Sequence, residues 1–320
     1  MDGQIFVISP TCVATGGTEL LQQLCKVLNN NNIKASMFYT EEYNNSPVYK
    51  RFSFYNNPIS KKIIDSPNNI VIVNETQTKY LKKIKKAKKY LWWLSVDNYF
   101  GSLKNKTDFL HKIYYFIKDF FYQKEFKTCK HLVQSYYAYL FLKKKKINDE
   151  NIYYLSDYLN DEYVQNAHNY ELSNKQNIIV YNPKKGIDFT KLLMKEIKEY
   201  QWIPIENMTP DAVSLTLRKS KVYIDFGNHP GKDRIPREAA ISGCCIITGR
   251  RGAANNDFDL NIPNKYKFID DESEIKNIHN CINDCMNNFK INYEKFNTYR
   301  NEILKEENKF QEDVLKIFKI

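Results

Sequence analysis

Residues 222–256 read V-Y-I-D-F-G-N-H-P-G-K-D-R-I-P-R-E-A-A-I-S-G-C-C-I-I-T-G-R-R-G-A-A-N-N, and this stretch decides the fold. An apolar strand at 222–226 is followed by a polar loop at 227–232, whose glycines permit sharp bends and close approach of a ligand. A helix is predicted to start near Pro236, a favoured first-turn residue, and to stop at Gly243. A second apolar strand follows at 244–248, so the stretch is one parallel β-α-β unit.

The loops that follow the two strands are strongly cationic. They open at the same carboxyl edge of the predicted parallel sheet, which is where open α/β sheets bind ligands. Their basic side chains are Lys232, Arg234, Arg250 and Arg251. Together with the backbone amides of a helix start, these side chains predict an anionic ligand, most simply a phosphate ester.

The same stretch resembles the donor-nucleotide region of glycosyltransferases with the GT-B fold, in which a glycine-containing loop precedes a helix with a ribose-binding Glu. Glu238 in P-R-E-A-A-I-S-G matches that Glu. Two further segments fit in the same order, G-G-T-E at 16–19 and Y-N-P-K-K-G at 181–186. One position departs, because many retaining members carry an acidic residue where this chain has Pro230. The resemblance therefore leaves open whether transfer is retaining or inverting.

The resemblance implies an α/β fold of two Rossmann-like domains, with a cleft between them and a C-terminal helix that crosses back onto the first. We expect an acceptor-binding domain at 1–170 and a donor-binding domain at 171–320, divided within the least apolar stretch. A chain of 320 residues is long enough for two such cores. Predicted strands lie at 5–9, 33–39, 70–73, 91–96, 131–134, 153–155, 177–181, 202–204, 222–226 and 244–248.

The net charge is +11, with 48 Lys and Arg against 37 Asp and Glu, which favours anionic partners. Basic runs at 82–89 and 143–146 lie near the aromatic-rich stretch 109–122. Such a surface suits peripheral contact with an anionic membrane, and an ordinary solvated face explains it equally well. We expect no nucleic acid as a partner, although the charge and 24 Tyr keep a nucleic-acid-binding protein as an alternative.

The chain contains no apolar stretch of membrane-spanning length and starts directly with a strand, which predicts a cytoplasmic protein, with attachment at the inner membrane face as an option. Seven cysteines without regular spacing indicate reduced thiols. Cys281 and Cys285 lack a second pair of suitable spacing, so no metal is expected. The phosphate-loop and dinucleotide-binding glycine motifs are both absent from the sequence.

In the first half, Asp97 follows a predicted strand in W-W-L-S-V-D-N-Y-F and is our first candidate for the catalytic base, with Glu19 second. An Asp-Asn pair at this place is also typical of a turn or helix cap. The resembled family puts sugar or acceptor contacts at the loop after the first strand, which assigns Gly16, Gly17 and Thr18 to the donor site. Capping of the helix by Thr18 or Glu19 explains the same residues structurally.

The other candidates for donor binding lie in the second half. They are Asn182, Lys184, Lys185, Met208, His229, Gly231, Lys232, Arg234, Arg237 and Glu238. The basic residues are expected to neutralise the leaving diphosphate without a metal. Met208 belongs to the segment 204–209 near the base, and His229 is expected to bind phosphate or sugar hydroxyls.

The function implied by the resemblance is metal-independent transfer of a sugar from a nucleotide sugar to a surface glycan, either free or lipid-linked. The nucleotide sugar is a co-substrate, and no cofactor is expected. A transferase or epimerase for another nucleotide-linked group is one alternative. A catalytically silent assembly subunit, suggested by Pro230, is another.

Overall fold

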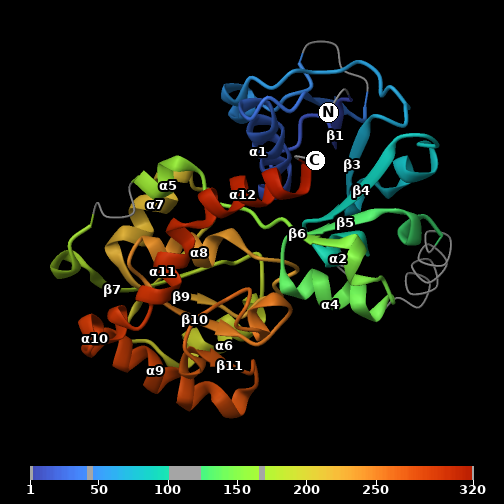
Figure 1. The fold of residues 1–320 in the computed structure, drawn as a ribbon. Helices are drawn as coiled ribbons and strands as arrows, with labels where there is room; N and C mark the ends of the chain where they lie inside the picture. Colours follow the sequence, from blue (N-terminus) through green and yellow to red (C-terminus); the bar gives the residue numbers. More distant parts are fainter. Residues whose placement is uncertain (1–2, 42–45, 101–123, 166–169, 319–320) are drawn as a thin grey trace. The chain divides into compact units, whose positions relative to one another are not determined.

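The computed structural model describes residues 3–41, 46–100, 124–165 and 170–318 (Figure 1). Two compact units result, one of Met1–Asp157 with Asn308–Ile320, the other of Tyr158–Glu307. The sequence placed the division between 170 and 171, whereas the chain enters the second unit earlier, because Leu159 and Tyr163 already belong to its core. The aromatic-rich stretch 109–122 lies outside the described residues.

The first unit is built on a parallel sheet that has six strands among the described residues, in the order β2-β1-β3-β4-β5-β6. Its strands are β1 (Ile5–Ser9), β2 (Ala35–Tyr39), β3 (Ile70–Asn74), β4 (Lys88–Trp93), β5 (Lys130–Val133) and β6 (Ile152–Tyr154). Its helical segments are α1 (Gly16–Asn30), η1 (Lys50–Tyr55), η2 (Glu75–Lys82), α2 (Val96–Tyr99), α4 (Tyr136–Lys144) and η3 (Asp149–Asn151). Central strands such as β1 are buried throughout, as expected for a parallel sheet covered on both faces.

The end of the chain packs on this first unit, as predicted for the C-terminal helix. Helix α12 (Glu306–Phe318) starts in the second unit and continues in the first. Phe310 stacks on Trp92 with ring centroids 6.4 Å apart, and Phe318 lies 5.4 Å from Tyr90. These contacts anchor the last helix to β4.

The second unit holds a parallel sheet with five described strands in the order β11-β10-β9-β7-β8. Its strands are β7 (Gln176–Tyr181), β8 (Gln201–Pro204), β9 (Ser220–Asp225), β10 (Cys245–Gly249) and β11 (Lys267–Phe268). Its α-helices are α5 (Asp161–Gln165), α6 (Ile187–Glu196), α7 (Pro210–Lys219), α8 (Arg234–Ile241), α9 (Ile275–Asn287), α10 (Phe289–Glu294) and α11 (Asn297–Leu304). Short 3₁₀ segments are η4 (Leu172–Asn174), η5 (Ala253–Asn255), η6 (Asn264–Tyr266) and η7 (Glu272–Glu274).

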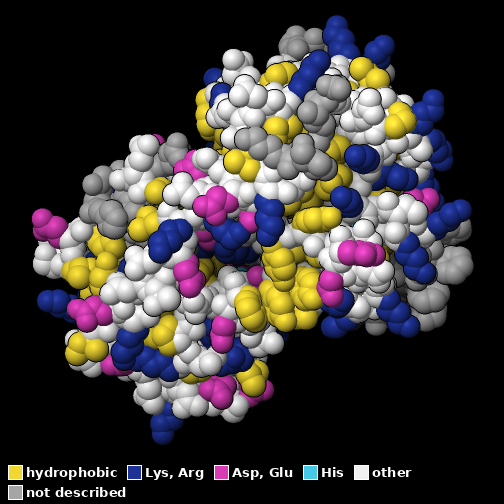
Figure 2. All heavy atoms as spheres, in the orientation of Figure 1, with side chains coloured by type: hydrophobic (Ala, Val, Ile, Leu, Met, Phe, Trp, Pro, Cys, Tyr) yellow, Lys and Arg dark blue, Asp and Glu magenta, His cyan; other side chains and the backbone are white. Residues whose placement is uncertain are grey.

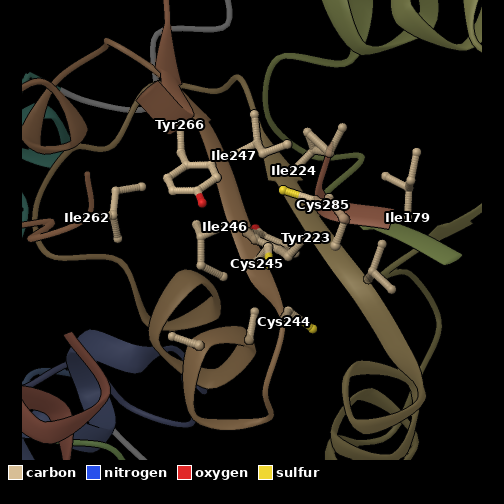
Figure 3. Packing of buried hydrophobic residues seen from close by; sticks show 14 of the residues in the cluster. Ile179, Tyr223, Ile224, Cys244, Cys245, Ile246, Ile247, Ile262, Tyr266 and Cys285 are labelled. Atoms are coloured by element: carbon tan, nitrogen blue, oxygen red, sulfur yellow. The ribbon is translucent and has the colours of Figure 1, made fainter. Parts of the chain in front are cut away.

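The core of the second unit lies around β9 and β10 (Figure 3). Tyr223 and Ile224 of β9 pack with Ile246 and Ile247 of β10, and all four are buried. The predicted α/β architecture with two Rossmann-like sheets is therefore confirmed. All seven cysteines are free thiols.

Several predicted boundaries were wrong in an informative way. Helix α8 begins at Arg234, before Pro236, because the first helical N–H groups need no intrahelical acceptor and proline is tolerated anywhere in the first turn. Strand β4 starts at Lys88 and ends at Trp93, so Asp97 lies in the short helix α2 and not at the strand end. The stretch 292–318, predicted as one helix, is divided among α10, α11 and α12.

Candidate functional site

Three loops meet at the carboxyl edge of the second sheet. They are 182–186 after β7, 226–233 after β9 and 250–253 after β10, and we call them the edge loops. They are neighbours because β10, β9 and β7 are adjacent parallel strands. The predicted convergence of the two loops of 222–256 is thus present, and the Y-N-P-K-K-G segment adds a third.

Glycines stand at the points where the edge loops touch. A Cβ on Gly186, which has φ +59°, would lie 2.4 Å from the carbonyl carbon of Phe226. A Cβ on Gly227 would lie 2.1 Å from the Cβ of Lys185, and one on Gly252 would lie 2.1 Å from the carbonyl oxygen of His229. Contacts this close exclude any side chain, so the three loops support one another through their backbones.

Beneath these loops lies a cluster of charged residues. His229 is buried between two carboxylates, with Nδ1 3.4 Å from Asp233 Oδ2 and Nε2 3.7 Å from Asp225 Oδ1. Lys185 of the first loop pairs with Asp233. The cluster therefore ties the loop after β7 to the loop after β9.

Asp225 is held in its ionised form by this environment. Burial alone would raise its pKa, but His229, Lys185 and the amide of Gly227 together hold the pKa of Asp225 below its ordinary value. Tyr223 Oη donates to Asp225 Oδ2 at 2.9 Å, and the Gly227 amide donates to Oδ1 at 2.9 Å.

A second ion-pair group joins the loop after β9 to helix α12. Glu306 accepts from Lys232 Nζ at 2.6 Å and from Arg237 Nη1 at 2.7 Å. The Arg237 side chain is fully buried, and its guanidinium also donates to the carbonyls of Lys232 and Asp233. The expectation that Arg237 contacts the donor is therefore corrected, because in this structure its guanidinium is enclosed by the loop that it supports.

The other candidates of the second unit differ in exposure. Lys184 is exposed, whereas Asn182 is buried and its Oδ1 accepts from the Lys184 amide, so Asn182 shapes the turn. Arg234 and Glu238 are half-buried on the first turns of α8, and Gly231 is buried in the loop before it. Met208 is partly buried against the core.

The two arginines of the third edge loop are bound to neighbouring residues. Arg251 pairs with Asp270, and Nη2 of Arg250 donates to Asn264 Oδ1 at 3.2 Å. Both arginine side chains are in contact with the segment that surrounds β11.

In the first unit, the loop after β1 starts α1 with a capping box. Thr15, rather than Thr18 or Glu19, is the N-cap: its Oγ1 accepts from the Thr18 amide at 3.2 Å, and Thr18 Oγ1 accepts from the Thr15 amide at 2.9 Å. Thr18 is thereby used by the helix start. Gly16 is exposed, and Gly17 lies against Leu94 beside β4.

The two candidate acids of the first unit lie in different surroundings. Glu19 is only 2% exposed and accepts from Tyr55 Oη at 3.2 Å, which favours a structural role in packing η1 on α1. Asp97 is half-buried, and its Oδ1 accepts from Tyr137 Oη at 3.3 Å. Burial and the adjacent carboxylate raise the pKa of Tyr137 to about 12, so the tyrosine stays a donor to Asp97.

Sequence reasoning missed Asp225, Asp233 and Glu306 as parts of the site. The spacing of Asp225, His229 and Asp233, four residues apart, was a signal that was available. Glu306 gave none, because 69 positions separate it from Arg237.

No family model matches this sequence, and no curated protein matches it. Solved structures do match in fold. S. aureus TarM in complex with UDP, fondaparinux and α-GlcNAc-glycerol is 16% identical with a TM-score of 0.56, covering 81% of this chain but 57% of TarM. Anabaena HepE in complex with UDP and glucose is 10% identical with a TM-score of 0.64, covering 98% of this chain and 99% of HepE.

A third match is WaaG, a glycosyltransferase involved in lipopolysaccharide biosynthesis. It is 9% identical with a TM-score of 0.59, covering 97% of this chain and 99% of WaaG. Identities this low establish the fold alone. The chain therefore has the GT-B fold of the glycosyltransferases whose donor region its sequence resembles.

Proposed function

We propose that this chain is a glycosyltransferase that moves a sugar from a nucleotide-activated donor to a glycan acceptor. The observation that carries the proposal is the convergence of the three edge loops at the start of α8. There Lys232 and Arg234 stand beside Glu238, the residue that matches a ribose-binding Glu. This arrangement suits a nucleoside diphosphate, whose charge needs cations and whose ribose needs an acceptor.

The proposed chemistry divides between the two units. In an inverting transfer, Asp97 takes the proton of the acceptor hydroxyl as its oxygen bonds to the anomeric carbon. The bond from that carbon to the diphosphate oxygen breaks, and the leaving group keeps the electron pair. Lys232, Arg234 and the first amides of α8 stabilise this growing charge, so the bond-breaking step is proposed to need no metal.

UDP is the first nucleotide to test, because the TarM and HepE structures named above contain UDP. The test is a thermal-shift or ligand-observed NMR titration with UDP, GDP, CDP, CMP, ADP and dTDP. Arg234→Ala and Glu238→Ala are each expected to weaken the preferred nucleotide by about ten- to a hundredfold, because each removes a charge-assisted hydrogen bond.

The matched control is Lys219→Ala, which removes an exposed cation at the far end of α7 in the same unit. It should leave nucleotide affinity unchanged. Selective binding of one nucleotide that both site variants abolish supports the proposal. Binding of oligonucleotides with no nucleotide binding at millimolar concentration would overturn it.

Product analysis tests the reaction class. The fold also occurs in a structure named as the N-terminal domain of a trehalose-6-phosphate phosphatase, so fold alone does not fix the chemistry. Transfer releases the nucleoside diphosphate in proportion to the glycoside formed, whereas an epimerase keeps sugar and nucleotide joined.

We further propose that the acceptor is a lipid-linked glycan at the inner face of the cell membrane, reached by peripheral contact. In the described part of the chain, no helix is long and apolar enough to span a bilayer. Basic side chains are spread over the face drawn in Figure 2. One group of them is organised by Asp65, whose carboxylate accepts from the amides of Lys85, Lys86 and Ala87 and so joins the segments around 61–65 and 82–87.

We call the result the basic surface. It consists of the exposed Lys61, Lys62, Lys82, Lys83, Lys85 and Lys86, with the half-exposed Ile59 and Ile64 among them. Each lysine near an anionic bilayer contributes about 1 kcal/mol. Sedimentation with phosphatidylglycerol vesicles should carry the protein down, and phosphatidylcholine vesicles should not.

Reversing three charges at Lys62, Lys85 and Lys86 to Glu should abolish this sedimentation. The matched control reverses the exposed Lys191, Lys195 and Lys198 of the second unit and should not change it. Equal loss in both triple variants would indicate non-specific charge attraction and remove this part of the proposal.

A further inference from the structure

The loop between β9 and α8 brings three metal-ligand side chains together. Asp225, His229 and Asp233 each offer an atom, and these atoms all lie within 4.8 Å of one another. The side chains of Asp225 and His229 are 1% and 3% exposed, and that of Asp233 is 20% exposed. Buried carboxylates need a positive partner, because an isolated charge is costly in a protein interior.

His229 Nε2 has no hydrogen-bond partner among the described residues, although it is buried. It faces Asp225 Oδ1 at 3.7 Å, which is too long for a hydrogen bond. A buried polar atom left in this state costs about 1 to 3 kcal/mol, so the native site should contain something between the two atoms.

The spacing suits two ligands of one ion. Metal bonds to imidazole nitrogen and carboxylate oxygen are about 2.0 to 2.2 Å long, which places neighbouring ligands roughly 3 to 3.6 Å apart. The 3.7 Å between His229 Nε2 and Asp225 Oδ1 needs only a small adjustment to match.

A second buried atom without a partner lies next to this pair. Thr248 Oγ1 makes no hydrogen bond within the described residues. Thr248 is the register partner of Asp225 on the adjacent strand β10, so the two side chains project from the same face of the sheet. Two unpartnered polar atoms beside one carboxylate indicate a ligand that the protein atoms do not supply.

The carboxylate of Asp225 is already fixed in place for such a role. Tyr223 Oη and the Gly227 amide each donate to one of its oxygens, as expected of groups that orient a metal ligand. Lys185 acts in the opposite direction, because its ammonium occupies Asp233 and competes with any other cation.

We propose that Asp225, His229 and Asp233 form a binding site for a divalent transition cation such as Mn²⁺ or Zn²⁺. One imidazole and two carboxylates are a donor set that both ions accept. The cation joins the end of β9 to the start of α8 and fixes the loop between them. The site requires no nucleotide and no role in bond breaking, so it goes beyond the proposed glycosyl transfer and is independent of it.

The test is direct titration of the full chain with Mn²⁺ alone after dialysis against a chelator, followed by the electron paramagnetic resonance signal of the free ion. Wild-type protein should bind one equivalent. Nitrogen hyperfine coupling from a histidine should appear in the spectrum of the bound ion, a readout that needs no variant.

His229→Gln and Asp225→Asn should each weaken Mn²⁺ by at least about tenfold, the scale on which even supporting groups of a metal site act. Lys185→Met should tighten it, because the competing ammonium is gone. The matched control is His279→Gln, which breaks the exposed pair of His279 with Glu199 and should leave affinity unchanged. Circular dichroism confirms that each variant is folded.

Three results would overturn the site. They are no Mn²⁺ binding at millimolar concentration, binding that His229→Gln leaves intact, and bound Mn²⁺ without nitrogen coupling. Tighter binding by Lys185→Met distinguishes this site from surface carboxylates, which that substitution does not touch.

Discussion

Gly252 and His229 hold the second and third edge loops together by direct backbone contact. The His229 carbonyl oxygen lies 2.1 Å from the place a Cβ on Gly252 would take, and it accepts from the Ala253 amide at 2.8 Å. Gly252 also has φ +60° and ψ −134°, a conformation that is essentially restricted to glycine. The position of Lys232 and Arg234 over the second sheet therefore depends on a residue that has no side chain.

Gly252→Ala should consequently disturb the site and the fold together. We expect the free energy of unfolding to fall by roughly 1 to 3 kcal/mol, from the strained backbone conformation alone. Nucleotide affinity should fall as well, because the loop after β9 loses its support. Urea unfolding and nucleotide titration measure the two effects.

The matched control is Gly17→Ala, whose Cβ would meet only Leu94 Cδ1 at 3.4 Å, an ordinary contact. It should leave the unfolding free energy nearly unchanged. A Gly252→Ala protein as stable as wild type would show that the third loop relaxes freely and does not brace the second.

The strand order and the site differ in how far the sequence predicted them. Apolar runs such as 5–9 and 222–226 are buried on both faces, so periodicity and length identified them correctly. The edge loops followed from their position after those strands. Glycine and proline in a turn mark where a loop bends, which is why 227–232 was correctly assigned as a loop.

The polar wiring of the site was not predictable in the same way. Arg237 was assigned to the donor by its sequence neighbourhood, yet it is buried on Glu306, which comes from a helix far along the chain. Similarly, the KKIKKAKK run was treated as a surface, although Lys88 and Lys89 belong to β4. Side-chain partners of this kind depend on tertiary packing, which local pattern does not contain.

Glu306→Gln should destabilise the second unit, because it removes the carboxylate from two cations. Arg237 is fully buried, and breaking a buried ion pair on one side costs about 3 to 5 kcal/mol. Nucleotide binding should weaken through the loss of the Lys232 contact that holds the loop. Thermal unfolding and the nucleotide titration report the two changes.

Glu312→Gln on the same helix is the control, since Glu312 is exposed. Its effect on both measurements should be small. Equal melting temperatures for Glu306→Gln and wild type would mean that Arg237 is satisfied by loop carbonyls without Glu306.

His131 should make the stability of the first unit depend on pH. Burial is the main cause that lowers the pKa of His131 from 6.5 to about 4, outweighing the hydrogen bond between its Nε2 and the Phe126 carbonyl. As pH falls below 6.5, the unfolded chain takes up the proton while the folded chain does not. Stability is therefore complete above pH 6.5 and decreases by roughly 3 kcal/mol as pH approaches 4.

Urea unfolding at several pH values measures this dependence, followed by the fluorescence of Trp93, whose Nε1 donates to His131 Nδ1 at 3.0 Å. His131→Gln should be less stable at pH 7 but flatter between pH 6.5 and 4. A variant with the same slope as wild type would assign the pH dependence to other groups.

Asp97→Asn should reduce turnover while leaving donor binding intact, because Asp97 belongs to the first unit and the donor is proposed to bind the second. Removal of a general base lowers the rate constant by about 10² to 10⁴. Tyr137→Phe should have a smaller effect in the same direction, since it removes only the hydroxyl that orients the carboxylate. The chain supplies a matched control in Asp149→Asn, because Asp149 also accepts from a tyrosine of α4, Tyr139, yet is exposed and pairs with Lys143. Single-turnover rates and nucleotide affinities of the four proteins separate the two effects: an equal loss in Asp97→Asn and Asp149→Asn, or no loss in the first, would transfer the role of base to another residue.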